Sequence, residues 1–458
     1  MTQRYDAIIV GAGQAGPPLA GRLTAAGQTV AVIERKLVGG TCVNYGCIPT
    51  KTLVASAHAA HVARRGADFG VGTGDITVDM AKVKARKDGV VKDDRDGLES
   101  WLDGMDGCTL IRGHARFTGP HTMTVDGQEL VADRFFLNVG GRAVVPDIPG
   151  LSDIDYLTNV GILQLDSVPE HLVIVGGSYI ALEFAQMYRR FGAAVTVVEK
   201  GPRLTAREDE DVSATIKEIL EGEGIATELD ATGMQIVKRD NGFELIPRAG
   251  ATPIAGTHLL VATGRQPNTD ELGLELAGVE TDARGFIVVD DALRTTAEHI
   301  WAMGDCNGKG AFTHTSYNDF EIVAANLLDD EPRRVSDRIP TYALYIDPPL
   351  GRAGMTVAEV LKSGRKALVG KRPMTRVGRA VEKGESQGFM KIVVDAETEQ
   401  ILGAAILGVG GDEVIHCILD IMSAKAKYTT LTHTVHIHPT VSELVPTMLE
   451  EMTPLTAD

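Results

Sequence analysis

Two short apolar runs have the uninterrupted hydrophobic pattern of strands buried on both faces of a sheet. Residues 7–10 and residues 172–175 contain only alanine, leucine, isoleucine and valine. Each run leads into a glycine-containing turn, then into a helical stretch that ends near residue 26 or residue 191, and then into a second apolar strand. The chain is therefore predicted to contain the same strand–helix–strand unit twice.

The first unit carries a glycine pattern at the turn between strand and helix. Gly11, Gly13 and Gly16 follow the first strand, and Glu34 ends the second strand about twenty residues later. Gly11 suits the turn, Gly13 lets the backbone approach a pyrophosphate, and Gly16 lets the helix pack on the strand. We expect Glu34 to accept a hydrogen bond from a ribose hydroxyl. Together these positions predict a dinucleotide site.

The second unit repeats this pattern with one change. A shift of 165 residues aligns Gly11 with Gly176, Gly16 with Ala181, and Glu34 with Glu199. Ser178 replaces the middle glycine, which predicts a slightly looser approach to the pyrophosphate. Because a 2′-phosphate would face the carboxylate of Glu199, this unit is predicted to prefer NAD(H). Lys200 and Arg203 weaken that preference without reversing it.

The remaining pattern divides the chain further. Charged helices are expected at 55–65 and 81–101, short strands at 109–131, and strands followed by glycine at 135–141, 259–265 and 300–305. From about residue 337 the pattern changes to β-alternation at 389–394 and 401–407, then a helix at 411–424 and a tail at 436–449. The prediction is an α/β protein with two Rossmann-type dinucleotide-binding domains and a C-terminal α+β domain. The expected limits are 1–150 completed by 265–335, 151–264, and 336–458.

Charge and hydropathy narrow the classes of partner. The 458 residues carry a formal net charge of −17, which disfavours nucleic acid and anionic membranes as partners. No apolar run approaches the length of a membrane span, and the N-terminal residues lack the pattern of a secretory signal. We therefore expect a cytoplasmic protein.

Two cysteines five positions apart supply the candidate chemistry. Pro49 suits the first turn of a helix, so Cys47 is predicted at the helix N-terminus, where a thiolate is favoured. Cys42 is expected in a glycine-flanked loop, where an outside molecule can reach it. A zinc site is not expected, because no second pair of Cys or His ligands lies near the two cysteines in the sequence. A purely structural disulfide is not expected either, because the cytosol keeps such bonds reduced. The pair is therefore interpreted as a redox-active disulfide, and no metal ligands are predicted.

Residues 39–51, the doubled nucleotide unit and the Gly304–Asp305 pair resemble the FAD-dependent pyridine nucleotide–disulfide oxidoreductases. This group contains dihydrolipoamide dehydrogenase, glutathione reductase and mercuric reductase. The resemblance implies an enzyme with FAD and NAD(H) as cofactors, and a homodimer whose active site is shared between chains. It places Cys47 against the flavin as a charge-transfer thiolate, while Cys42 exchanges with substrate.

The resemblance also implies further contacts. Lys51 would lie near the flavin and pair with Glu183, while Glu34 and Asp305 would bind the two ends of FAD. Tyr179 is compatible both with covering a flavin face and with packing its own helix. The other expected cofactor contacts are Gly40, Thr41, Gly140, Gly176, Ser178, Ala181, Glu199, Gly264, Arg265 and Gly304.

The C-terminal segment resembles the acid–base motif of the family. His438 is the expected acid–base residue and Glu443 its orienting carboxylate, while His436 is expected to be structural. Exchange between dithiols and disulfides needs such a pair, because a thiol proton must be taken up and returned near neutral pH. We therefore expect a dithiol or disulfide substrate, with a lipoyl group preferred.

The alternative is a metal-ion reductase that uses the same cysteines as soft ligands for mercuric or cupric ions. Parts of the chain, among them residues 316–323, resemble a branch related to reactive-chlorine resistance. The tail at 450–458 contains no cysteine pair of the kind that mercuric reductase uses to pass its ion inward.

Overall fold

The N-terminal unit is built on a mostly parallel sheet in a computed structural model that describes residues 2–456. The strand order is β3-β2-β1-β6-β5-β4, with β16 also paired to β6. The strands are β1 (Gln3–Val10), β2 (Val30–Glu34), β3 (Cys108–Arg112), β4 (Ala115–Gly119), β5 (Thr122–Val125), β6 (Gln128–Leu137) and β16 (Ile300–Ala302). Residues far apart in the sequence thus share one sheet, because β16 pairs in parallel with the end of β6.

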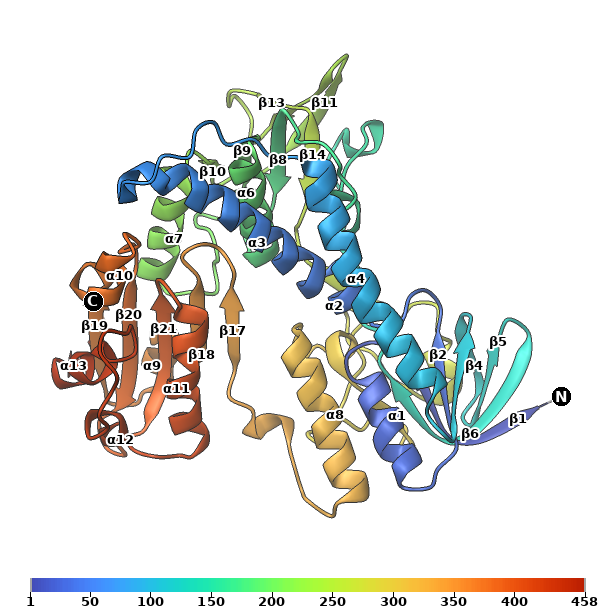
Figure 1. The fold of residues 1–458 in the computed structure, drawn as a ribbon. Coiled ribbons are helices and arrows are strands. Elements are labelled where there is room, and N and C mark those ends of the chain that lie inside the picture. Colours follow the sequence, from blue (N-terminus) through green and yellow to red (C-terminus); the bar gives the residue numbers. More distant parts are fainter. Residues whose placement is uncertain (1, 457–458) are drawn as a thin grey trace.

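Both faces of β1 are covered, which explains its uninterrupted apolar sequence. Ile9 points into a core shared with Leu19 of α1 (Gly16–Ala25) and Val323 of α8 (Thr313–Leu328). Ile8 points to the opposite face, where it packs in a cluster with Phe135 of β6. Figure 1 shows α1 and α8 side by side against this sheet.

The second unit has the predicted parallel sheet, in the order β10-β9-β8-β14. Its elements are α5 (Asn159–Ile162), β8 (His171–Val175), α6 (Tyr179–Phe191), β9 (Ala194–Val198), α7 (Glu210–Gly222), β10 (Ala226–Glu228) and β14 (His258–Val261). A small antiparallel sheet adds β11 (Gln235–Arg239), β12 (Gly242–Ile246) and β13 (Ile254–Gly256). A pair of short strands, β7 (Gly141–Ala143) and β15 (Arg265–Pro267), joins the segments that follow β6 and β14.

The first glycine of each unit has the same backbone conformation and the same close backbone contact. Gly11 has φ +103°, and a Cβ there would lie 2.2 Å from the backbone oxygen of Asn138. Gly176 has φ +121°, and a Cβ there would lie 2.4 Å from the backbone oxygen of Ala262. Each glycine therefore lies against the residue that follows the neighbouring parallel strand, and no larger residue fits.

The C-terminal unit is a six-stranded sheet in the order β17-β18-β21-β20-β19-β22. Its strands are β17 (Thr341–Leu344), β18 (Leu350–Gly354), β19 (Ala367–Pro373), β20 (Phe389–Asp395), β21 (Ile401–Leu407) and β22 (Thr453–Pro454). Its helices are α9 (Val357–Ser363), α10 (Gly378–Glu382), α11 (Gly411–Ser423), α12 (Thr429–Thr432) and α13 (Leu444–Glu450).

The β-alternation expected at 389–394 and 401–407 is wrong, because every residue of β20 is buried and in β21 only Leu402 is partly exposed. Ile392 packs with Ile415 and Ile418 of α11 on one face of the sheet. Phe389 packs on the opposite face, in the same cluster as Phe184 of α6. This sheet is therefore covered on both sides, once by its own helix and once by the second unit (Figure 1).

Two long helices link the first and second units: the first packs on the second unit, and the second extends from there to the sheet of the first unit. They are α3 (Cys47–Arg64) and α4 (Met80–Asp103), preceded by the short helix α2 (Gly40–Tyr45). Helix α3 packs against α6 and against α4 (Figure 1). None of the helices in residues 2–456 combines the length and the apolar character that a membrane-spanning helix requires.

Candidate active site

The two predicted redox cysteines lie on consecutive helices. Cys47 is the first residue of α3, as the position of Pro49 predicts. The expectation that Cys42 lies in a loop is wrong, because it lies in α2, which begins after Gly39 in a left-handed conformation. Both cysteines are half-buried thiols in the structure. The two helices are separated by a single residue, Gly46.

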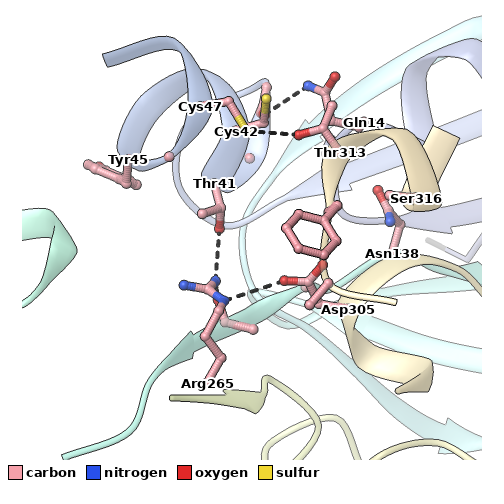
Figure 2. A pocket seen from close by; sticks show the side chains of 18 of the residues that line it. Gln14, Thr41, Cys42, Tyr45, Cys47, Asn138, Arg265, Asp305, Thr313 and Ser316 are labelled. Carbon is pink, nitrogen blue, oxygen red and sulfur yellow. Dashed lines mark hydrogen bonds and ion pairs between the residues drawn. The ribbon is translucent and has the colours of Figure 1, made fainter. Parts of the chain in front are cut away.

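The surroundings shift the pKa values of the two thiols in opposite directions. The hydrogen bond from the Cys42 thiol lowers the pKa of Cys47 most; burial opposes it, and Thr313 and the charge of Lys51 lower it further, to about 6. The hydroxyl of Thr313 lies 3.1 Å from the Cys47 sulfur (Figure 2). The pKa of Cys42 is raised well above its usual range by the hydrogen bond to Cys47 and by burial. Cys47 is thus the thiolate of the pair and Cys42 the protonated thiol.

Lys51 lies one turn after Cys47 and reaches the second unit. Its ammonium donates to both carboxylate oxygens of Glu183, at 3.0 and 2.8 Å. Glu183 lies on α6, is almost fully buried, and also accepts a hydrogen bond from the backbone N–H of Tyr345 at 3.0 Å. The pairing that the resemblance implies is therefore present.

One cavity of about 1220 Å³ brings together residues from the first unit, α6, α8, β17 and α11. The predicted site residues that line it are Gly11, Gly13, Glu34, Gly40, Thr41, Cys42, Cys47, Lys51, Gly140, Tyr179, Glu183, Arg265 and Asp305. Segments separated by more than two hundred residues thus meet at the cysteine pair.

The residues at the two ends of this cavity fit FAD. Gly11, Gly13 and Gln14 of the loop before α1 line the cavity, and the glycines leave room for a phosphate close to the backbone. The first turn of α1 adds little, because Pro17 and Pro18 have no N–H and the N–H of Gly16 donates to Asn138. Glu34 lines the cavity at the end of β2, held by the N–H groups of Ala12 at 3.0 Å and Lys36 at 2.7 Å. A carboxylate held in this way suits a ribose hydroxyl.

The other end is defined by Asp305 and Arg265. The two side chains approach to 3.5 Å, and Arg265 also donates to the hydroxyl of Thr41 at 3.4 Å (Figure 2). Burial raises the pKa of Asp305, although the charge of Arg265 lowers it. Gly140, with φ +64°, lines the cavity directly before β7.

Two of the predicted glycines, Gly16 and Gly304, do not line the cavity but shape the backbone next to it. A Cβ on Gly16 would lie 2.3 Å from the backbone oxygen of Gly11, so this glycine closes the turn rather than lining the cavity. The backbone N–H of Gly304 donates to buried Asp319 at 2.8 Å.

Sequence reasoning missed three residues of the site. The amide of Asn138 accepts from Gly16 N–H at 3.3 Å and donates to the backbone oxygen of Met303 at 3.0 Å, which links the glycine loop to the end of β16. A polar residue directly after a buried strand is the signal that could have identified it. Thr313 and Phe312 carry no comparable signal, because only the fold brings α8 to the cysteines.

The second glycine loop lies outside this cavity. Ser178 precedes α6 without a side-chain cap, and Ala181 is buried within the helix. Glu199 directly follows β9 and accepts from the backbone N–H of Gly201 at 2.8 Å. Gly264, with φ +136°, follows the neighbouring strand β14. Tyr179 is the first residue of α6 and packs against Phe312, with ring centroids 5.4 Å apart and ring planes tilted by 41°, so it both packs and lines the cavity.

His438 and Glu443 form a pair away from this cavity. Nδ1 of His438 lies 3.1 and 2.9 Å from the two carboxylate oxygens of Glu443. The histidine side chain is 80% exposed, whereas the glutamate is largely buried. Neither residue lines the cavity that holds the cysteines. His436 bonds to its neighbour, the backbone oxygen of Thr434, at 3.0 Å.

Comparison with known families defines the class. The model of the pyridine nucleotide-disulphide oxidoreductases matches residues 5–319, and the dimerisation domain of the same group matches residues 340–449. The chain belongs to this family, as its cysteine and glycine motifs predict. It is an FAD-dependent flavoprotein disulfide reductase with NAD(P)H as its nucleotide partner. The predictions of fold class, enzyme class and cofactors are confirmed.

Particular relatives span three branches of the family. The chain is 37% identical to the probable pyridine nucleotide-disulfide oxidoreductase RclA of Escherichia coli K12, over 96% of this chain and 97% of the relative. It is 33% identical to a dihydrolipoyl dehydrogenase of Thermus scotoductus (96% and 95%) and 32% identical to a mercuric reductase of Staphylococcus aureus (93% and 80%).

A solved structure agrees with this placement. The Cu(II) complex of the HOCl-induced flavoprotein disulfide reductase RclA from Escherichia coli superimposes with a TM-score of 0.90 at 35% identity, covering 98% of this chain and 99% of that chain.

Proposed function

We propose that this flavoprotein exchanges electrons with a dithiol or disulfide substrate at Cys42, and that His438 of a second copy of the chain serves as the acid–base group. The observation that carries the proposal is the pairing of His438 Nδ1 with Glu443. This contact fixes one tautomer of the ring and leaves Nε2 directed away from the carboxylate. A histidine held by a carboxylate is suited to accept a proton near neutral pH.

The different states of the two thiols explain why a base is needed. Cys42 attacks the substrate disulfide, and because its pKa is raised, its proton has to be taken up by His438 during the attack. The new bond joins Cys42 to one substrate sulfur, and the other sulfur leaves with the proton from His438. The Cys47 thiolate then attacks the Cys42 sulfur, which forms the Cys42–Cys47 disulfide and releases the second substrate sulfur as a thiolate. Cys47 needs no base, because it is already ionised.

The exposed C-terminal segment supports a dimer with shared sites. Val435 and Ile437 are 96% and 79% exposed beside His438, although both are apolar. A surface of this kind is typical of a protein–protein contact. Because His438 does not line the cavity of its own chain, we infer that it reaches the cysteines of the other subunit.

The cofactors set the source of electrons. Bound FAD passes electrons between the nicotinamide nucleotide and the cysteine pair. We propose NADH as the preferred nucleotide, since Glu199 directly follows β9 and Arg203 donates to the backbone oxygen of Ala206 in its own loop (3.0 Å). A carboxylate at this position disfavours a 2′-phosphate.

Two substrate classes are supported. A lipoyl group is the preferred dithiol, and the similarity to dihydrolipoyl dehydrogenase supports it. Reduction of a soft metal ion is the second candidate, with Cu(II) as the leading ion, because the RclA structure is a Cu(II) complex and Cys47 is a thiolate. An anaerobic comparison of dihydrolipoamide, Cu(II) and Hg(II), each with NAD(H) and NADP(H), tests the proposal. Turnover of dihydrolipoamide supports the dithiol function, and turnover of metal ions alone contradicts it.

A further inference from the structure

An aromatic cluster stands beside the reactive thiol. Phe312 precedes α8, and its ring centroid lies 5.4 Å from that of Tyr179 and 5.6 Å from that of Tyr342. The Phe312 and Tyr342 rings are parallel to within 3°. His314 stacks on Phe312 from the same helix, at 5.4 Å and 10°. Phe312 is therefore held by side chains from α6, β17 and α8.

The residue after Phe312 contacts the thiol. Thr313 is the first residue of α8, and its hydroxyl lies 3.1 Å from the sulfur of Cys47. The start of α8 is fixed further by Thr315, whose hydroxyl bonds to both the N–H (3.1 Å) and the backbone oxygen (2.8 Å) of Phe312. The Thr315 contacts and the packed ring of Phe312 together hold the backbone from which the Thr313 hydroxyl extends.

On the β17 side of the cluster, Tyr342 is held by a buried ion pair. The hydroxyl of Tyr342 donates to the carboxylate of Glu208. Glu208 is buried and accepts from Nε of buried Arg352 at 3.1 Å. Because both ionised groups are enclosed, this contact holds Tyr342 in one position. The parallel ring of Phe312 has little freedom as a result.

We propose that Phe312 is a positioning residue for Cys47: clamped between Tyr179 and Tyr342, it holds the Thr313 hydroxyl in contact with the sulfur. The inference rests on the proposed function in so far as Cys47 acts there as a thiolate. A hydroxyl that donates to an anion is effective only at short range and with good alignment. The clamp supplies that alignment without touching the thiol itself.

The ionisation of Cys47 can be measured without any substrate. In the reduced, FAD-loaded protein, the rate of alkylation by iodoacetamide is followed against pH, and the peptide that carries Cys47 is quantified by mass spectrometry. The wild-type midpoint is expected near pH 6. Thr313→Val should raise it by about one pH unit, because one charge-assisted hydrogen bond is lost. Phe312→Leu should raise it by about the same amount, while Phe312→Tyr and Thr313→Ser should leave it unchanged.

A double variant separates positioning from general loosening. If the ring acts through the hydroxyl, Phe312→Leu should add no further shift in the Thr313→Val background. Phe320→Leu is the matched control, since Phe320 is a buried phenylalanine on the same helix that packs in the core of the first unit. It should not change the midpoint. Should Phe312→Leu fail to retain FAD, Tyr342→Leu removes the facing ring instead and is expected to give the same shift.

The outcomes distinguish this inference from the proposed function. A wild-type midpoint near that of an ordinary thiol would remove the thiolate role of Cys47 and with it the proposed function. A wild-type midpoint near 6 that is unchanged in Phe312→Leu would overturn only the clamp. The clamp is equally overturned if Phe320→Leu shifts the midpoint as much, or if the effects of Phe312→Leu and Thr313→Val add.

Discussion

The ammonium of Lys51 lies within 3.0 Å of both carboxylate oxygens of Glu183. This ion pair joins α3, which begins at the reactive thiol, to α6, which begins at the glycine loop of the second unit. Glu183 is almost fully buried, so the lysine is its charge partner in the interior. The contact places one positive and one negative charge near Cys47, and their effects on the thiol oppose each other.

The first prediction concerns these two charges. Lys51 lowers the pKa of Cys47 and Glu183 raises it. Lys51→Met should therefore shift the alkylation midpoint of Cys47 above pH 6, and Glu183→Gln should shift it below. Lys92→Met, at an exposed lysine on α4, is the control and should leave it in place. Shifts of the same sign in the two active-site variants would refute this electrostatic description.

The second prediction assigns the two cysteines. Cys42→Ser leaves the Cys47 thiolate intact beside the bound cofactor, so a long-wavelength charge-transfer absorbance is expected in the oxidised holoprotein. Cys47→Ser should lack it. The absorbance should fade as the pH is lowered, because the thiolate becomes protonated. A band found only in Cys47→Ser would reverse the two roles.

The third prediction concerns nucleotide choice. NADH should exceed NADPH in kcat/KM by roughly tenfold or more, which corresponds to about 1.4 kcal/mol. Glu199→Ala should narrow this ratio, since the carboxylate no longer repels a 2′-phosphate. Steady-state kinetics with both nucleotides provides the measurement. A wild-type preference for NADPH would show that Lys200 and Arg203 dominate recognition.

The fourth prediction tests whether two chains share each site. Cys47→Ser and His438→Ala homodimers should both be nearly inactive with a dithiol substrate. A heterodimer of the two contains one intact site, which combines the cysteines of one chain with the histidine of the other. Its turnover per dimer should be about half that of the wild type. A heterodimer as inactive as its parents would place both groups in one chain.

The sequence allowed much of the fold to be predicted, because its strongest signals are local. The apolar runs at 7–10 and 172–175 have the two covered faces that they require, and the position of Pro49 placed Cys47 at the start of a helix. The contacts that tune Cys47 could not be predicted. Thr313 lies 266 residues away in the sequence and reaches the thiol only because α8 packs on the first sheet.

Two local errors have physical causes. Cys42 was expected in a loop because glycines flank it, but left-handed Gly39 begins a short helix instead of preventing one. Strand β20 was expected to have one exposed face, and the second unit covers that face. In both cases the residue pattern is compatible with either structure, and the packing around it decides between them.

The most direct test of the proposed function is the effect of His438→Ala on dithiol turnover. Dihydrolipoamide attacks the Cys42–Cys47 disulfide, and its attacking thiol has to give its proton to a base, so turnover should fall by about 10²–10⁴-fold when His438 is removed. Reduction of the enzyme by NADH, followed by stopped flow, should be little changed, because it needs no proton from this residue. Glu443→Gln should give an intermediate loss. High wild-type dihydrolipoamide turnover that collapses in His438→Ala is the predicted result; negligible wild-type dithiol turnover, beside Cu(II) or Hg(II) reduction that His438→Ala leaves intact, would contradict it.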